Sequence, residues 1–86
     1  MEHLVMFPIY GRFIGDFAVH LVPVDSDDTI GEVAEKIAAF SVGRRLPAEP
    51  ADGYEVLIDG RVIPGDMHLN QLSLYPLQWI DVRWKR

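Results

Sequence analysis

The sequence predicts an α+β domain that spans residues 1–86, in which one helix packs across a mixed sheet of four or five strands. Residues 29–42 are the only stretch with apolar side chains at helical spacing, so a single helix is expected. Other stretches have the composition of strands and are separated by turn signals, of which Asp59-Gly60 is the clearest. A chain of 86 residues buries only about 60–65% of its unfolded surface, so the helix and the sheet must share one thin core.

Two strands joined by a turn are predicted before the helix. The first is Leu4–Phe13, where Pro8 indicates a sheet edge, a bulge or the start of the strand. The turn Ile14-Gly15-Asp16 leads to the second strand, Phe17–Val24, so the two form an antiparallel hairpin. We expect the alternate side chains of one face of this hairpin to enter the core, namely Phe7, Ile9, Phe13, Phe17, Val19 and Leu21.

The opposite face of the hairpin is also poor in charged residues. It is predicted to carry Pro8, Tyr10, Arg12, Ala18, His20 and Val22. A solvated face of an antiparallel sheet usually carries polar side chains, and one helix can cover only one face. The sequence therefore predicts an apolar face that is left for a partner, in line with an apolar content of 49% in so small a domain.

The helix is predicted over Thr29–Val42. Thr29 and Glu32 have the spacing of a capping box, Glu32 and Lys36 form an i,i+4 pair, and Gly43 ends the helix. The acids Asp25, Asp27 and Asp28 are interpreted as a solvated cap at the positive end of the helix dipole. Burial of Ile30, Val33 and Ile37 should contribute roughly 1.5–3 kcal/mol each.

The second half of the chain supplies the remaining strands. A loop over Leu46–Gly53 precedes strands at Tyr54–Ile58, Arg61–Ile63 and Gln78–Trp84, with a helical or 3₁₀ turn at Leu69–Leu74. In the last strand, Ile80 and Val82 are expected to point inward and Trp79 outward, while Trp84 at the strand end could face either side.

Composition excludes several classes of function. The net charge of −5 argues against nucleic acid and anionic membranes as partners, and no apolar run approaches the roughly 20 residues that span a bilayer. The chain has no cysteine, so disulfides, iron–sulfur clusters and thiol catalysis are excluded. The N-terminal stretch does not resemble a signal peptide, and a cytoplasmic location is expected.

No catalytic or cofactor site is predicted in this chain. The histidines His3, His20 and His68 are isolated and lack metal-ligand spacing, and no Gly-rich phosphate loop precedes a helix. His20 is better explained as a sheet residue with a hydrogen-bonded partner than as a ligand. We therefore expect no catalytic, cofactor-binding or metal-binding residues.

The order of elements resembles the β-grasp fold of ubiquitin-like proteins. Two stretches carry this resemblance: VDSDDTIGEVAEKI at residues 24–37, and LIDGRVIPGDMHLNQLSLYPLQWIDVRW at residues 57–84. The chain ends without the Gly-Gly pair that conjugated members of this class use, so conjugation is not expected.

A closer resemblance is to the gamma subunit, or B component, of toluene monooxygenase hydroxylases. The shared motifs are Phe7-Pro8, Asp16-Phe17, Val33-Ala34-Glu35-Lys36, Val42-Gly43-Arg44-Arg45, Pro64-Gly65-Asp66-Met67 and Ile80-Asp81-Val82. Gly65 departs from the family's arginine. The resemblance implies a non-catalytic subunit that docks on a large alpha subunit, which carries the di-iron centre, in a complex that also contains a beta subunit. It implies an oxidoreductase complex that uses NADH and dioxygen on an aromatic, alkene or isoprene substrate.

Seven residues are candidates for partner binding: Tyr10, His20, Val22, Arg44, Arg45, Trp79 and Trp84. The aromatic residues are either ordinary exposed side chains or anchors of a buried interface. Arg44 and Arg45 either neutralise the end of the helix or pair with acids of a partner. The alternative function is a free-standing ubiquitin-like module that binds transiently. An obligate subunit should bury about 2,000 Å² or more, and a transient module less.

Overall fold

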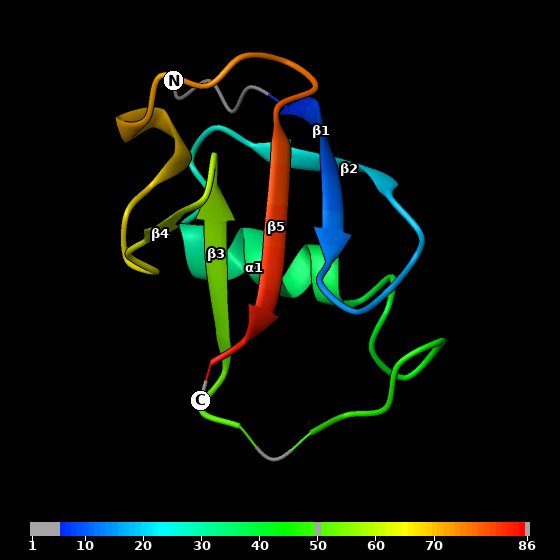
Figure 1. Cartoon of the computed structure of the whole chain (residues 1–86). Coiled ribbons are helices and arrows are strands. Elements are labelled where there is room, and N and C mark those ends of the chain that lie inside the picture. Colours follow the sequence, from blue (N-terminus) through cyan, green and yellow to red (C-terminus); the bar gives the residue numbers. More distant parts are fainter. Residues whose placement is uncertain (1–5, 50, 86) are drawn as a thin grey trace.

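The computed structural model describes residues 6–49 and 51–85, and it forms one mixed sheet with one α-helix across it (Figure 1). In chain order the elements are β1 (Met6–Phe13), β2 (His20–Asp25), α1 (Ile30–Ala38), β3 (Tyr54–Ile58), β4 (Arg61–Ile63), the 3₁₀ helix η1 (Leu69–Gln71) and β5 (Trp79–Trp84). The five strands lie in the order β2-β1-β5-β3-β4, with β1 and β5 parallel and the other pairs antiparallel. The predicted β-grasp class is confirmed.

The core lies between α1 and the face of the sheet that α1 crosses (Figure 1). Ile30, Val33 and Ile37 are 0%, 0% and 1% exposed, which confirms the predicted helix stripe. The helix packs tightly against the sheet at Gly11 of β1, because a Cβ built there would stand only 2.6 Å from Cγ1 of Ile37. Glycine at this position therefore lets α1 lie directly on β1.

Both ends of α1 follow from local chemistry. Thr29 caps the helix: its hydroxyl accepts from the Glu32 amide at 3.1 Å, and the Glu32 carboxylate accepts from the Thr29 amide at 2.8 Å, which confirms the capping box. The helix ends at Ala38, four residues before the predicted Val42, because the chain continues in tighter turns up to Gly43, whose φ is +81°. Lys36 pairs with Asp28 at 2.6 Å, so the predicted pair with Glu32 is wrong.

The predicted inward face of the second strand is also wrong. The strand begins at His20, and residues 14–19 form its connection to β1. Ile9 lies opposite Val22 and Phe7 opposite Val24, and both valines are buried. Phe17, Val19 and Leu21, predicted to be core residues, are 88%, 40% and 58% exposed. Directly opposed residues of an antiparallel pair share a face, so the burial of Ile9 fixes Val22 inward.

Pro8 and Pro23 lie opposite each other in β1 and β2. β1 is a central strand rather than an edge, but its pairing with β5 begins only at Tyr10, so Pro8 precedes that ladder. The Tyr10 amide donates to the Gln78 carbonyl. The even-numbered residues of β1 therefore turn their backbone nitrogens toward β5 and away from β2. At the opposite positions, Leu21, Pro23 and Asp25, the backbone nitrogen therefore faces the free edge of β2, and at Pro23 it carries no N–H.

The second half of the chain agrees closely with the prediction. β3 and β4 have the predicted bounds, the 3₁₀ turn covers the first half of the predicted Leu69–Leu74 segment, and β5 begins one residue later than predicted. Ile80 and Val82 are buried, and Trp79 points outward. Trp84 is half-buried on the core side, with its ring centroid 5.4 Å from that of Phe13 and 5.1 Å from that of Tyr54. The predicted start of the first strand at Leu4 lies outside the described residues.

Candidate interaction surface

The face of the sheet that points away from α1 carries a band of exposed apolar side chains, and no helix in the described part of the chain covers it (Figure 1). We call this surface the outer face. The strand register places Leu21, Tyr10 and Trp79 side by side across β2, β1 and β5. The outer face also includes Met6, Pro8, Pro23, Leu57 and Val62. Met6, Leu21 and Val62 are at least half exposed, and Tyr10 and Trp79 are 39% and 44% exposed.

The outer face has an ordered polar centre beside these aromatic rings. The carboxylate of Asp81 accepts one hydrogen bond from Nε of Arg12 at 3.0 Å and another from Nε1 of Trp79 at 2.9 Å. The guanidinium of Arg12 lies 5.7 Å from the centre of the Trp79 ring, and the Tyr10 and Trp79 ring centroids are 6.5 Å apart. These contacts fix the Trp79 ring, so its exposed surface is presented in one orientation.

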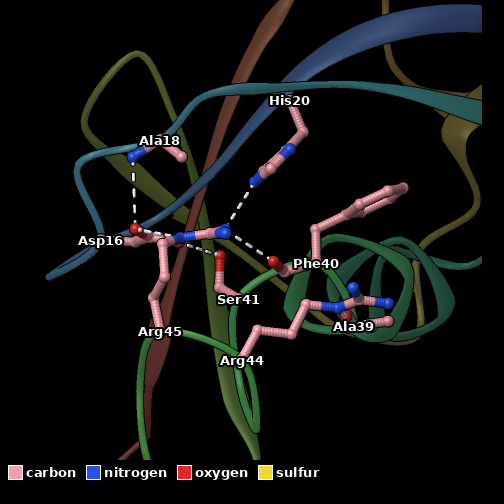
Figure 2. A network of polar contacts seen from close by, with 8 residues as sticks. All are labelled: Asp16, Ala18, His20, Ala39, Phe40, Ser41, Arg44 and Arg45. Atoms are coloured by element: carbon pink, nitrogen blue, oxygen red, sulfur yellow. Dashed lines mark hydrogen bonds and ion pairs between the residues drawn. The ribbon is translucent and has the colours of Figure 1, made fainter.

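A second cluster joins the β1–β2 connection to the turns after α1, and its centre is the buried carboxylate of Asp16 (Figure 2). Asp16 accepts from the Ser41 hydroxyl at 2.6 Å, from Nε of Arg45 at 2.8 and 2.9 Å, and from the Ala18 amide at 3.2 Å. We call these residues the Asp16 cluster. A buried carboxylate is stable only when it is paired and hydrogen-bonded, and here it is both.

Arg45 makes several polar contacts within the chain (Figure 2). Besides Asp16, its guanidinium donates to the Phe40 carbonyl at 2.7 Å, and Nη2 lies 2.8 Å from Nε2 of His20. The His20 ring stacks on Phe40 at 4.9 Å. Arg44 donates to the Ala39 carbonyl at 3.0 Å, at the C-terminal end of α1. Of the two explanations for the arginines, the structure favours contacts within the chain.

The Asp16 cluster shifts the ionisation of its two charged members. The hydrogen bond from Arg45, then the one from Ser41, hold the pKa of the Asp16 carboxyl well below its ordinary value of 3.8. The hydrogen bond with Asp16 in turn raises the pKa of Arg45. The pair is therefore ionised at neutral pH, and it fixes the loop and the helix end to each other.

The structure thus divides the seven candidate residues. Tyr10 and Trp79 lie together on the outer face. Val22, 1% exposed, lies in the core, so its predicted place on the exposed face is wrong. His20, opposite Gly11, lies on the helix side with Arg45, so its predicted place on the opposite face is also wrong. Trp84 packs toward the core.

Sequence reasoning missed the role of Asp16 and the exposure of Phe17. It treated Asp16 as a turn residue, because nothing in a residue's identity reports the burial of its carboxylate. One signal was present: Asp16-Phe17 and Val42–Arg45 were two separate motifs of the resemblance, and Asp16 and Arg45 prove to be in contact.

Within residues 6–49 and 51–85, no three His, Cys, Asp or Glu side chains gather into a group that could hold a metal ion. Over the same ranges, no helix has the length and apolar character that a membrane span requires.

Comparison with known proteins adds a family to this geometry. The family model described as toluene-4-monooxygenase system protein B (TmoB) matches residues 6–84. The chain is 54% identical, over 94% of its length and 98% of the relative's, to the gamma subunit of the oxygenase component of the alkene monooxygenase system of Xanthobacter autotrophicus. It is 38% identical, over 88% of its length and 92% of the relative's, to the gamma subunit of the hydroxylase component of the toluene-4-monooxygenase system of Ectopseudomonas mendocina.

Solved structures agree with both the family and the fold. A chain of the toluene 4-monooxygenase HD complex with the inhibitor 4-bromobenzoate superposes with a TM-score of 0.87 at 34% identity, over 94% of this chain and all of that one. The ubiquitin of Caldiarchaeum subterraneum superposes with a TM-score of 0.72 over 95% of this chain and 96% of its own, at 18% identity, which shows the ubiquitin-like fold. The chain therefore belongs to the toluene-4-monooxygenase system protein B family, the gamma subunits of monooxygenase hydroxylase complexes.

Proposed function

We propose that this chain is a non-catalytic subunit that docks the outer face of its sheet onto the large alpha subunit of the hydroxylase and stabilises that subunit. The observation that carries the proposal is the row of Leu21, Tyr10 and Trp79 on a face that α1 does not cover. Tyrosine and tryptophan are the residues most enriched among interface anchors. An apolar band of this kind is typical of a permanent contact with another subunit.

The chemistry is assigned to the partner. In a carboxylate-bridged di-iron protein, glutamates and Glu-x-x-His pairs project into a helix bundle, and this chain has a single nine-residue α-helix in its described part. The alpha subunit is expected to carry the di-iron centre and the substrate site, with the beta subunit in the same complex. The alpha subunit would use dioxygen, together with electrons from NADH, to oxidise an aromatic or alkene substrate. The role of this chain is to hold helices of the alpha subunit in place.

Co-expression of this chain with the alpha and beta subunits tests the proposal. A complex that survives gel filtration is expected. Tyr10→Ala and Trp79→Ala should each weaken it by about 2 kcal/mol or more, because each removes an aromatic anchor. Trp79→Ala also removes a hydrogen bond to Asp81. Trp79→Phe serves as the variant that keeps an aromatic side chain but lacks this hydrogen bond. The measurement is the fraction of this chain that elutes with the complex.

Asp27→Ala is the matched control, because Asp27 is exposed on the loop before α1, away from the strands that form the outer face. It should leave assembly unchanged. If the isolated chain is a monomer and neither aromatic substitution alters co-purification, the outer face is not the docking surface. A transient ubiquitin-like binding module would then explain the chain better.

A further inference from the structure

Phe17 is the most exposed large apolar side chain in the described part of the molecule, at 88%. It lies in the connection between β1 and β2, not on the strands that form the outer face. An exposed phenyl ring contributes no hydrophobic stabilisation to the isolated chain, whereas the same ring buried in an interface would. The ring is therefore a candidate for burial by a partner.

The residues on both sides of Phe17 are held by the Asp16 cluster. The carboxylate of Asp16 accepts the amide of Ala18, so it closes the backbone around Phe17. The same carboxylate is tied to Ser41 and Arg45 beyond α1 (Figure 2). The Arg45 guanidinium also lies 6.0 Å from the centre of the Phe17 ring. A backbone segment fixed in this way loses little conformational freedom when Phe17 binds, which favours affinity.

Phe17 lies in the connection that leads directly into β2, where Leu21 lies beside Tyr10 on the outer face. Val19 is 40% exposed, and so is Ile14, which directly follows β1. The connection thus carries three exposed apolar side chains at the end of the sheet where β2 begins. A partner that covers the outer face and extends past the start of β2 would meet Phe17.

We infer that Phe17 is a second anchor of the interface, inserted into an apolar pocket of the alpha subunit, and that the Asp16 cluster is the device that positions it. This inference rests on the proposed function, since the alpha subunit is the partner that covers the outer face. Arg45 acts here through Phe17 rather than by pairing with an acid of the partner, because its Nε and Nη2 donors are engaged within the chain.

A competition experiment tests the inference in the assembled complex. Tagged wild-type chain and an untagged variant are co-expressed with the alpha and beta subunits. Mass spectrometry then compares the variant's share in the purified complex with its share in the lysate. Phe17→Ala should be depleted about 30-fold or more, the loss that marks an anchor residue. Tyr75→Ala is the matched control: Tyr75 is an aromatic residue, 61% exposed, near the start of β5, at the opposite end of the sheet from the β1–β2 connection.

Arg45→Lys tests the positioning role, because lysine keeps the charge but not the geometry of the two bonds to Asp16. Arg45→Lys alone should lower the variant's share in the complex several-fold. When Phe17 is already alanine, Arg45→Lys should cause no further depletion. In the Tyr10→Ala background its effect should persist in full. Ser41→Ala, which removes one bond to Asp16, should show the same dependence on Phe17.

The outcomes separate the two proposals. Depletion of Phe17→Ala without depletion of Tyr75→Ala supports the inference. If Tyr10→Ala and Trp79→Ala are depleted and Phe17→Ala is not, the inference is wrong and the docking function stands. If none of the three is depleted, the docking function itself is wrong. Equal depletion of Tyr75→Ala and Phe17→Ala also contradicts the inference, because the loss would then follow from any exposed aromatic residue.

Discussion

At the scale of single residues, Asp16 connects parts of the chain that are far apart in sequence. Its carboxylate lies between the connection after β1 and the turns after α1, and it bonds Ser41 and Arg45, 25 and 29 residues away. Ion pairs on a protein surface contribute little, but the Asp16 side chain is fully buried. Removal of Arg45 would leave the buried Asp16 carboxylate without its counter-ion, which is strongly destabilising.

The lowered pKa of Asp16 predicts an acid-dependent loss of stability. A carboxyl group whose pKa is lower in the folded state stabilises the fold above its unfolded pKa, near 3.8, and this contribution disappears as the pH falls through the folded value. Asp16→Asn should therefore melt at a lower temperature than wild type at pH 7. The difference in melting temperature should narrow below about pH 4. Circular dichroism melts at pH steps from neutral to strongly acid measure it.

The exposed Asp27 supplies the control, and Asp27→Asn should follow the wild-type curve. A constant difference between wild type and Asp16→Asn across the whole pH range would show that the charge of Asp16 does not stabilise the fold.

At the scale of elements, the helix could be predicted from sequence, whereas the orientation of the second strand could not. One face of α1 is apolar, and its cap depends only on Thr29 and Glu32, which are close in sequence. The residue pattern alone therefore predicts both which face is buried and where the helix begins. In the second strand, apolar residues occupy both parities: Phe17, Val19 and Leu21 on one, Val22 and Val24 on the other. A shift of one residue exchanges the two faces, and only pairing with Ile9 and Phe7 decides between them.

The contact between α1 and β1 gives a prediction at this scale. Gly11→Ala places a methyl group against Ile37, so it should destabilise the fold by roughly 1–3 kcal/mol through overpacking. Ile37→Ala should cost about 2–5 kcal/mol through the cavity that it leaves. The double variant should be more stable than the sum of the two effects predicts, because the new methyl group enters the vacated space. Urea unfolding of the four proteins gives the coupling free energy.

If the two effects simply add, Gly11 and Ile37 are not in the close contact that the structure shows. Gly43→Ala is the comparison, because nothing lies within 4 Å of a Cβ at that position and its cost would come only from its φ of +81°.

At the scale of the whole molecule, the order of elements was enough to predict the topology. A hairpin, a helix and a returning strand leave few arrangements in which an 86-residue chain buries its helix, and the β-grasp is the one observed. The interaction surface was less predictable. Its aromatic pair, Tyr10 and Trp79, followed from alternation along their strands, but Phe17 and Leu21 were placed in the core because their exposure depends on the length of the β1–β2 connection.

Pro23 has a further consequence for a chain that exposes so much apolar surface before it meets its partner. Of the three residues of β2 that face the free edge, Pro23 has no N–H, and the Asp25 amide already donates to Asp28 at 3.0 Å. The other edge of the sheet, β4, is only three residues long. Neither edge is a good template for another strand, so we expect copies of the chain to meet face to face rather than extend into a cross-β fibril.

Pro23→Thr should remove this protection. The variant restores an N–H at the centre of the free edge of β2, and we expect it to form fibrils that bind thioflavin T under agitation, whereas the wild-type chain forms only dimers or amorphous aggregates. Pro47→Thr, in the loop after Leu46, is the matched substitution away from any strand and should behave as wild type. If the wild-type chain forms fibrils at the same rate as the variant, Pro23 does not protect the edge of β2. A subunit made in excess of its partner would thus remain available for assembly instead of being lost to polymerisation.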